Sequence, residues 1–291
     1  MYRRDPITGN ARLVRPGRAA RLRDQDRGCP FCVGHEHDTP AETGRRPRRD
    51  TTPTSADWSA RAFPNRFPLT EPHEVVVPSP EHVRRWRDLD IVQLRDGLSL
   101  LLERRRALQR EDAYVHAFIN DGARAGASIS HVHAQLAVLD RGANTDSLIA
   151  GVTSAGDCAT CALLQDEDLV VQRGNHHTLL AHPAPRLGGG LLLVPNEHRS
   201  ALDETRIVEF VELLHRAWQA VDTDLHTNAW LVADEARGAH WYAELQPRSS
   251  NLAGVELATG IAVSAADPRE TASSARERLA IRGAHHTGGR T

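Results

Sequence analysis

The chain has 291 residues, enough for one large or two moderate domains with a sizeable hydrophobic core. Its 36 Lys and Arg residues nearly balance its 38 Asp and Glu residues, so no net charge favours nucleic acid or a membrane surface as partner. The N-terminal sequence lacks the apolar core of a secretory signal, and no apolar run is long enough to span a bilayer. We therefore expect a cytoplasmic protein that binds neither nucleic acid nor membrane.

The first half of the chain predicts a loop, two strands, a helix and a third strand. Thr39–Ala56 is rich in Pro, Arg and Thr, which favours a loop. Trp58–Pro68 predicts a short strand and turn, and His73–Pro78 has the β-branched centre of a strand. Leucines at helical spacing predict an amphipathic helix within Asp88–Arg110, and Ala113–Asn120 predicts the next strand.

A glycine-rich loop and a histidine motif follow, from Asn120 to Gln135. Alternate side chains of a strand point to the same face, so His131, His133 and Gln135 would form one polar row. Glycine lets a backbone approach a ligand closely, and imidazoles beside such a loop suit phosphoryl or nucleotidyl transfer. The alternative is three polar residues on the wet face of an exposed strand.

The same order of features recurs after about residue 150. The repeated features are a C-x-x-C pair, a strand-turn-histidine segment (73–82, then 189–198), an amphipathic helix (88–110, then 203–222) and a motif beginning with histidine (131–136, then 240–245). Such a repeat predicts an internal duplication and an α+β fold, in which helices pack on an antiparallel sheet. We expect an N-terminal half of residues 1–150, a C-terminal half of residues 151–280 and a disordered tail of residues 281–291.

The four cysteines of the chain form two C-x-x-C pairs. Without an export signal, such pairs indicate metal or redox chemistry more than structural disulfides. Zinc prefers four tetrahedral nitrogen and sulfur ligands, so the first pair predicts a closed structural site made of Cys29, Cys32, His82 and His131. A redox dithiol is the weaker alternative, because it would not need the histidines.

The second pair predicts either a second metal site or a vestigial pair of thiols. By the repeat, the corresponding residues are Cys158, Cys161, His198 and His240. Motif matches of this kind carry false positives, so both alternatives stay open at this point.

Several unusual segments together resemble the galactose-1-phosphate uridylyltransferase family, a branch of the histidine-triad superfamily. The matching segments are DPITG…RPGRAAR (5–21), CPFCVGHE..TPAE (29–42), W..RAFPNRFP (58–68), HEVVVPSPEH (73–82), FINDGARAGASISHVHAQL (118–136) and HWYAELQPR…AGVELATG (240–260). The resemblance implies a pair of histidine-triad-like halves. It also implies a homodimer in which the subunits share the active site.

The resemblance also implies roles for individual residues. His133 would be the nucleophile that forms a covalent nucleotidyl-histidine, and Gln135 would hydrogen-bond the phosphate during transfer. The zinc ligands that it implies are the four residues of the first predicted site. Its substrate-binding positions are Arg18, Arg21, Asn65, Asn120, Gly126, Ser128 and Glu256. For the two arginines, a solvated basic patch is the alternative.

The expected activity is a ping-pong transfer of UMP between a UDP-hexose and a hexose 1-phosphate, as in galactose metabolism. The alternative enzyme is a sugar-nucleotide or dinucleotide phosphorylase or adenylyltransferase with phosphate or another small anion as acceptor. Val132 stands where the galactose enzymes typically have proline, and the ELATG segment resembles the phosphorylase branch more closely. A zinc-stabilised nucleotide-binding protein is the non-enzyme alternative. Tyr242 stands where the second half would need its nucleophile, so we expect one working site per chain.

Overall fold

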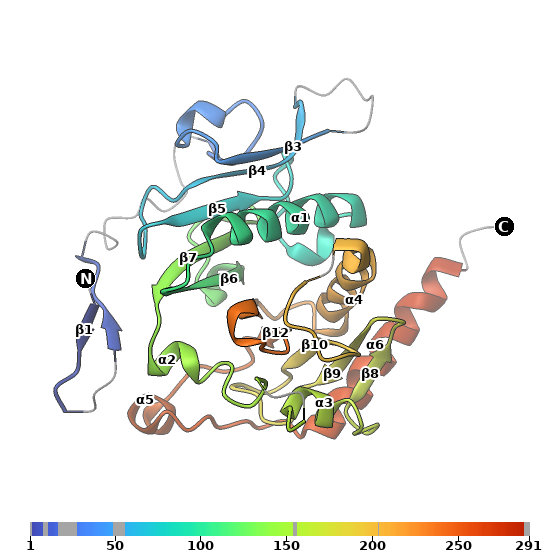
Figure 1. Ribbon diagram of the computed structural model, residues 1–291. Coiled ribbons are helices and arrows are strands. Elements are labelled where there is room, and N and C mark those ends of the chain that lie inside the picture. The colour runs from blue at the N-terminus through green and yellow to red at the C-terminus, as the bar shows by residue number, and fades with distance from the viewer. Residues whose placement is uncertain are drawn as a thin grey trace. The chain divides into compact units, whose positions relative to one another are not determined.

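A computed structural model describes residues 2–7, 11–16, 28–48, 56–153, 156–202 and 204–287 of the chain (Figure 1). The chain divides into two compact units. Unit 1 consists of residues 1–119 and 126–150, and unit 2 consists of residues 120–125 and 151–291. Within the described ranges, no helix combines the length and the apolar character that crossing a membrane requires.

The secondary structure follows the two halves of the chain. The strands and helices before residue 150 are β1 (Tyr2–Arg4), β2 (Ala11–Leu13), η2 (Glu36–Asp38), β3 (Gly44–Pro47), β4 (Trp58–Pro64), β5 (His73–Val77), η3 (Trp86–Asp88), α1 (Ile91–Leu108), β6 (Ala113–Asp121), η4 (Ala123–Ala125), β7 (Ala134–Asp140) and α2 (Ala143–Asp146). Those after it are α3 (Ala159–Leu163), β8 (Val170–Arg173), β9 (His177–Ala181), β10 (Leu191–Pro195), η5 (Glu204–Arg206), α4 (Ile207–Ala220), β11 (Thr227–Val232), η6 (Glu235–Arg237), β12 (Tyr242–Pro247), α5 (Gly254–Thr259) and α6 (Pro268–Thr287).

Each unit repeats one antiparallel arrangement of five strands. The order across the sheet is β3-β4-β5-β7-β6 in unit 1 and β8-β9-β10-β12-β11 in unit 2. Along the chain, α1 connects β5 to β6 and α4 connects β10 to β11. Each helix packs on its own set of strands: α1 on β4 and β7, α4 on β9 and β10. The predicted α+β class is therefore confirmed, and the matching strand orders support the internal duplication.

Helix α1 begins where its sequence supplies a cap. The Asp90 carboxylate accepts the backbone N–H groups of Val92 and Gln93, each at 2.8 Å, which satisfies donors that have no partner within the helix. On the sheet side, Arg104 makes a two-pronged salt bridge to Glu74 of β5. Gly97 permits this close packing, because a Cβ there would lie 2.4 Å from the Cβ of Pro78.

The opposite face of the unit 1 sheet carries the residues that position the predicted site. Val75 of β5 is paired with Phe63 of β4 on one side and with Gln135 of β7 on the other, so these three side chains share a face. Phe31, from the loop of the first C-x-x-C pair, packs into the same apolar cluster as Phe63 and Val75. The sheet thus separates the α1 core from the loop that bears Cys29 and Cys32.

Three segments differ from the sequence prediction. Strand β3 forms inside the predicted loop, because Gly44–Pro47 pairs with the edge of β4. Strand β7 begins only at Ala134, since the preceding Val132 N–H bonds to the carbonyl of Val83 instead of to a neighbouring strand. Helix α6 reaches Thr287, whereas the sequence placed the start of a disordered tail at residue 281.

Candidate active site and metal clusters

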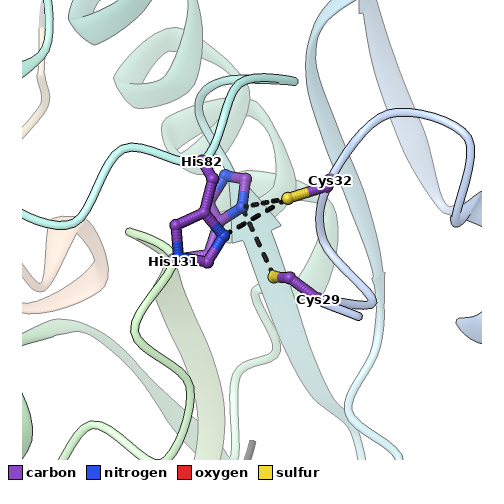
Figure 2. Close-up of side chains that lie close together, drawn as sticks. All are labelled: Cys29, Cys32, His82 and His131. Carbon is purple, nitrogen blue, oxygen red and sulfur yellow. Dashed lines mark hydrogen bonds between the residues drawn. The ribbon is translucent and has the colours of Figure 1, made fainter. Parts of the chain in front are cut away.

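The four residues of the first predicted metal site come together in unit 1. Figure 2 shows Cys29 and Cys32 on one side and the imidazoles of His82 and His131 facing them. The Cys32 sulfur lies 3.3 Å from His82 Nδ1 and 3.6 Å from His131 Nδ1, and the Cys29 sulfur lies 3.6 Å from His131 Nδ1. All four ligand atoms lie within 4.8 Å of one another.

These distances fit a tetrahedral metal ion. Zinc bonds of about 2.3 Å to sulfur and about 2.0 Å to nitrogen place sulfur and nitrogen about 3.5 Å apart at the corners of a tetrahedron. His131 Nε2 donates to the backbone carbonyl of Ser79 at 3.0 Å, which leaves Nδ1 as the lone-pair nitrogen facing the thiols. Burial lowers the pKa of His131 to about 4, so this ring is neutral, as a metal ligand must be.

The second C-x-x-C pair forms an equivalent cluster in unit 2. Cys161 Sγ lies 3.4 Å from His240 Nδ1 and 3.8 Å from His198 Nδ1, and Cys158 Sγ lies 3.5 Å from His240 Nδ1. Both histidines turn Nε2 to a backbone carbonyl, that of Gly238 for His198 and that of Pro195 for His240, whereas in the first cluster His82 Nε2 faces the Ser130 hydroxyl instead. The donor set is that of the first cluster, and the rings again turn Nδ1 to the thiols, which favours a second metal over a vestigial pair of thiols.

The predicted nucleophile His133 is buried in unit 1, with 5% of its surface exposed. Its Nδ1 donates to the backbone carbonyl of His131 at 2.9 Å. A neutral imidazole carries only one proton, so Nε2 is then the nitrogen with the nucleophilic lone pair. The ring packs edge-on against Phe31, whose centroid lies 5.3 Å away. The loop of the first metal cluster therefore contributes directly to the walls around His133.

A buried arginine anchors that loop. Arg61 of β4 is fully buried and donates to the carbonyl of Pro30 at 3.0 Å and to the hydroxyl of Thr39 at 2.9 Å. Its guanidinium also stacks 4.8 Å from the ring centroid of Phe63. Burial lowers the pKa of Arg61, but an arginine keeps its charge at neutral pH. Arg61 lies in the W..RAFPNRFP segment, but the sequence alone did not predict its burial or its contacts with the first C-x-x-C loop.

Gln135 and Asn65 also come together on this face. Asn65 Nδ2 lies 3.5 Å from Gln135 Oε1, and the same oxygen lies 3.1 Å from Nε2 of His73. His73 was not predicted as a site residue. His73 lies two residues before Val75, which pairs with Gln135, so it shares their face of the sheet; finding it requires the strand register.

The remaining predicted substrate positions lie at the end of β6, in the loop after it, in α5 or outside the described residues. Gly126 has a φ of +95°, a conformation that favours glycine, and Ser128 is exposed. In unit 2, Asn120 Oδ1 accepts from Asn228 Nδ2 at 2.8 Å, which turns the amide nitrogen of Asn120 away from Asn228. Arg18 and Arg21 fall within residues 17–27, which the structure does not describe.

Glu256 lies in the first turn of α5. Its carboxylate accepts the backbone N–H of Ala253 at 3.0 Å, which caps this short helix. The side chain is only half-buried, and several neighbouring apolar side chains are exposed. The structure thus gives Glu256 a local role in unit 2, and its predicted contact with substrate stays a prediction.

Unit 2 carries a different pair of residues at the positions of His133 and Gln135. Leu192 pairs with Glu244 as Val75 pairs with Gln135, and Tyr242 precedes Glu244 by two residues. Glu244 has 4% of its surface exposed, and its Oε1 has no hydrogen-bond partner within the described part of the chain. Burial raises the pKa of Glu244 to about 7, although the charge of Arg186 opposes this shift. An acid there would repel phosphate when ionised, in agreement with one working site per chain.

We expect Glu244→Gln to change the pH dependence of stability. A carboxyl with a pKa near 4.5 when unfolded and about 7 when folded binds its proton more tightly in the folded state. Below pH 4.5 the group carries its proton in both states. As the pH rises from 4.5 to 7, the group lowers the free energy of unfolding by about 3 kcal/mol in total. The variant should therefore be more stable than the parent at pH 8, measured by urea unfolding.

Comparing the parent with the variant separates the effect of Glu244 on the pH dependence of stability from that of its neighbour His182. His182 Nε2 lies 4.0 Å from Glu244 Oε2, and burial lowers the pKa of His182 to about 4. His182 alone makes stability rise with pH over the same range, in both proteins. Equal pH profiles for parent and variant would contradict the assignment.

Similarity to known proteins extends over nearly the whole chain. Residues 96–285 match the family described as a domain of unknown function (DUF4921), and residues 49–137 match the HIT domain. The chain is 26% identical over 328 aligned residues to ADP-glucose phosphorylase of Arabidopsis thaliana, with 94% of this chain and 92% of that protein covered.

Solved structures show the same likeness. A crystal structure of an ADP-glucose phosphorylase from Arabidopsis thaliana with bound ADP-glucose has a TM-score of 0.72 and 25% identity, covering 95% of this chain and 98% of that chain. A structure of uridylyltransferase has a TM-score of 0.79 and 21% identity, covering 96% and 98% of the two chains. The second likeness is one of fold.

Proposed function

This chain belongs to the DUF4921 family and, with its HIT domain, to the galactose-1-phosphate uridylyltransferase family of nucleotidyltransferases and phosphorylases. From this membership we propose that the chain transfers a nucleoside monophosphate from a sugar nucleotide to a small anionic acceptor through His133. We take ADP-glucose as the donor and inorganic phosphate as the acceptor. The relative that acts as an ADP-glucose phosphorylase supports this choice, and so does the ELATG segment.

The observation that carries the proposal is the orientation of the two side chains on β7 and its N-terminal extension. The hydrogen bond from His133 Nδ1 to the His131 carbonyl leaves Nε2 as the nucleophilic atom. Gln135 lies two residues further along the same face, and its amide nitrogen has no hydrogen-bond partner among the described residues. A nucleophile and a neutral donor on one face are what transfer of a phosphate-linked group requires.

The reaction proceeds in two displacements. His133 Nε2 attacks the α-phosphorus of the sugar nucleotide, a P–N bond forms, and the bond to the oxygen of the sugar 1-phosphate breaks. The Nδ1–H bond to the His131 carbonyl stabilises the positive ring that results. A phosphate oxygen then attacks the same phosphorus, the P–N bond breaks, and the nucleoside diphosphate leaves with neutral His133. The Gln135 amide donates to the phosphate oxygens in both steps.

Each metal cluster would hold a structural zinc ion. The two thiols and two imidazoles of each cluster supply four ligands, so the coordination shell is closed and holds no position for substrate. In unit 1 the ion would join the loop of Phe31 to the segment after β5, which carries His82, and to the segment before β7, which carries His131. Its contribution there is to hold Phe31 and His133 in place.

We also propose that the chain forms a homodimer. Apolar side chains are exposed between residues 252 and 263, including Leu257 with 72% of its surface exposed and Ile261 with 64%. Exposed apolar groups in one segment favour burial against a partner surface. The family resemblance makes a second copy of the chain that partner.

The test is to incubate the protein with ADP-glucose or UDP-glucose, each radiolabelled at the α-phosphate. We expect acid-labile label on the protein from ADP-glucose, and release of labelled ADP when inorganic phosphate is added. Labelling by UDP-glucose, with release of a labelled UDP-hexose upon addition of a hexose 1-phosphate, would identify the uridylyltransferase instead. No label from either donor would rule out both activities.

A further inference from the structure

The amide oxygen of Gln135 is held by two side chains, Asn65 and His73, and the proposed reaction assigns no direct role to His73. His73 Nε2 lies 3.1 Å from Gln135 Oε1, and Asn65 Nδ2 lies 3.5 Å from the same atom. His73 and Gln135 are both buried, on the neighbouring strands β5 and β7. A polar contact in such a place acts at low dielectric and is stronger than the same contact at the surface.

The backbone determines which nitrogen of His73 carries the proton. The N–H of Leu69 donates to His73 Nδ1 at 2.8 Å, so Nδ1 presents a lone pair. In the neutral ring the proton then lies on Nε2, which faces Gln135 Oε1. Hydrogen bonds therefore run in one direction, from Leu69 N–H to His73 and from His73 to Gln135.

Asn65 is oriented by the same principle. The N–H of Phe67 donates to Asn65 Oδ1 at 2.8 Å, which turns Asn65 Nδ2 toward Gln135. Two donors thus converge on Gln135 Oε1. The reverse rotamer of the Gln135 amide would set its own N–H₂ group against both of them and lose both hydrogen bonds.

We propose that His73 is a positioning residue that fixes the Gln135 amide with its nitrogen, and not its oxygen, toward the transferred phosphate. The inference rests on the proposed function for the presence of the phosphate. An amide is nearly symmetric in shape, so without an external donor either end could face the ligand. A carbonyl oxygen facing the phosphate oxygens would repel them, whereas the N–H₂ group stabilises their charge.

Two substitutions at position 73 separate positioning from packing. In His73→Asn, the amide oxygen can replace Nδ1 as acceptor for Leu69, but no donor from position 73 reaches Gln135, and Asn65 at 3.5 Å is the remaining donor to its oxygen. In His73→Gln, the amide nitrogen can replace Nε2 as donor to Gln135, and the acceptor for Leu69 is lost. We expect His73→Asn to lower kcat and the rate of protein labelling by ADP-glucose about 10- to 100-fold, with KM within about threefold.

His73→Gln should keep the rate of labelling within about fivefold of the parent. If His73→Gln loses as much activity as His73→Asn, the packing of the ring matters and the proposal is overturned. A double-variant cycle with Gln135→Ala adds a stricter condition, because His73 is proposed to act only through Gln135. The loss from His73→Asn should vanish in the Gln135→Ala background, and losses that multiply would overturn the proposal.

A measurement without nucleotide keeps the inference separate from the proposed function. In the full chain labelled with nitrogen-15 histidine, the ring nitrogens of His73 should report a neutral ring protonated at Nε2, assigned by comparison with His73→Gln. A ring protonated at Nδ1 would overturn the proposal even if the enzyme is active. The expected tautomer together with no labelling by any sugar nucleotide would instead contradict the proposed function alone.

Discussion

His133→Ala is expected to abolish the covalent labelling of the protein and to lower kcat by at least about 10⁴-fold, because no other atom then forms the P–N bond. The neighbouring His131 cannot replace His133 as nucleophile. Its Nε2 donates to the Ser79 carbonyl, and its Nδ1 faces the thiols of Cys29 and Cys32. The measurement is the stoichiometry of acid-labile label after incubation with radiolabelled ADP-glucose, followed by steady-state kinetics.

A matched variant is needed because His133 also packs against Phe31. His133→Asn keeps a polar side chain that can donate to the His131 carbonyl, and it should lose labelling as completely as His133→Ala. Both variants should retain the zinc content of the parent. Label that persists in either variant and maps to another residue would show that the nucleophile is misassigned.

Cys29→Ser is expected to lower the zinc content by one equivalent per chain and to destabilise unit 1. A closed metal site contributes directly to folding free energy, and a serine hydroxyl is a poor substitute for a thiolate ligand. We also expect labelling to slow about 10- to 100-fold, because the loop of Cys29 carries Phe31 against His133. Metal analysis and thermal unfolding, with and without a zinc chelator, measure these effects.

Cys158→Ser provides the matched control in the second cluster. It should remove one equivalent of zinc as well, since Cys158 and Cys161 face His240 in the same way. Labelling of His133 should stay within about threefold of the parent, because unit 2 holds Tyr242 and Glu244 in place of the reactive pair. Equal loss of labelling in the two cysteine variants would contradict a local role for the first cluster, and full zinc retention would contradict the ligand assignment.

Residue type and spacing sufficed to predict the parts of the molecule that depend on local chemistry. Two C-x-x-C pairs and a repeated strand-turn-histidine order predicted both groups of candidate metal ligands, which the structure brings together. The same repeat predicted the α+β fold, because each copy must form an equivalent set of strands and a helix. The roles of His133 and Gln135 came from the family resemblance and stay predictions.

The residues that were missed depend on contacts between distant segments. His73 gains its importance from the register of β5 against β7 and from one backbone N–H at Leu69, neither of which has a sequence signature. Strand β3 contains Arg45, Arg46 and Pro47, which favour a loop, and it exists because it pairs with β4 at the edge of the sheet. The role of Arg61 likewise depends on its burial and on its bonds to Pro30 and Thr39, which the sequence does not reveal.

The first metal cluster also has a consequence for the order of folding. Cys29 and Cys32 are neighbours in sequence, but His82 lies 50 residues beyond Cys32 and His131 lies 102 residues beyond Cys29. Two thiols do not complete a tetrahedral shell, so tight binding waits until β5 and β7 have paired and brought both imidazoles near. We therefore expect zinc to slow the unfolding of the chain more than it changes the rate of folding, which refolding and unfolding kinetics with and without a chelator measure.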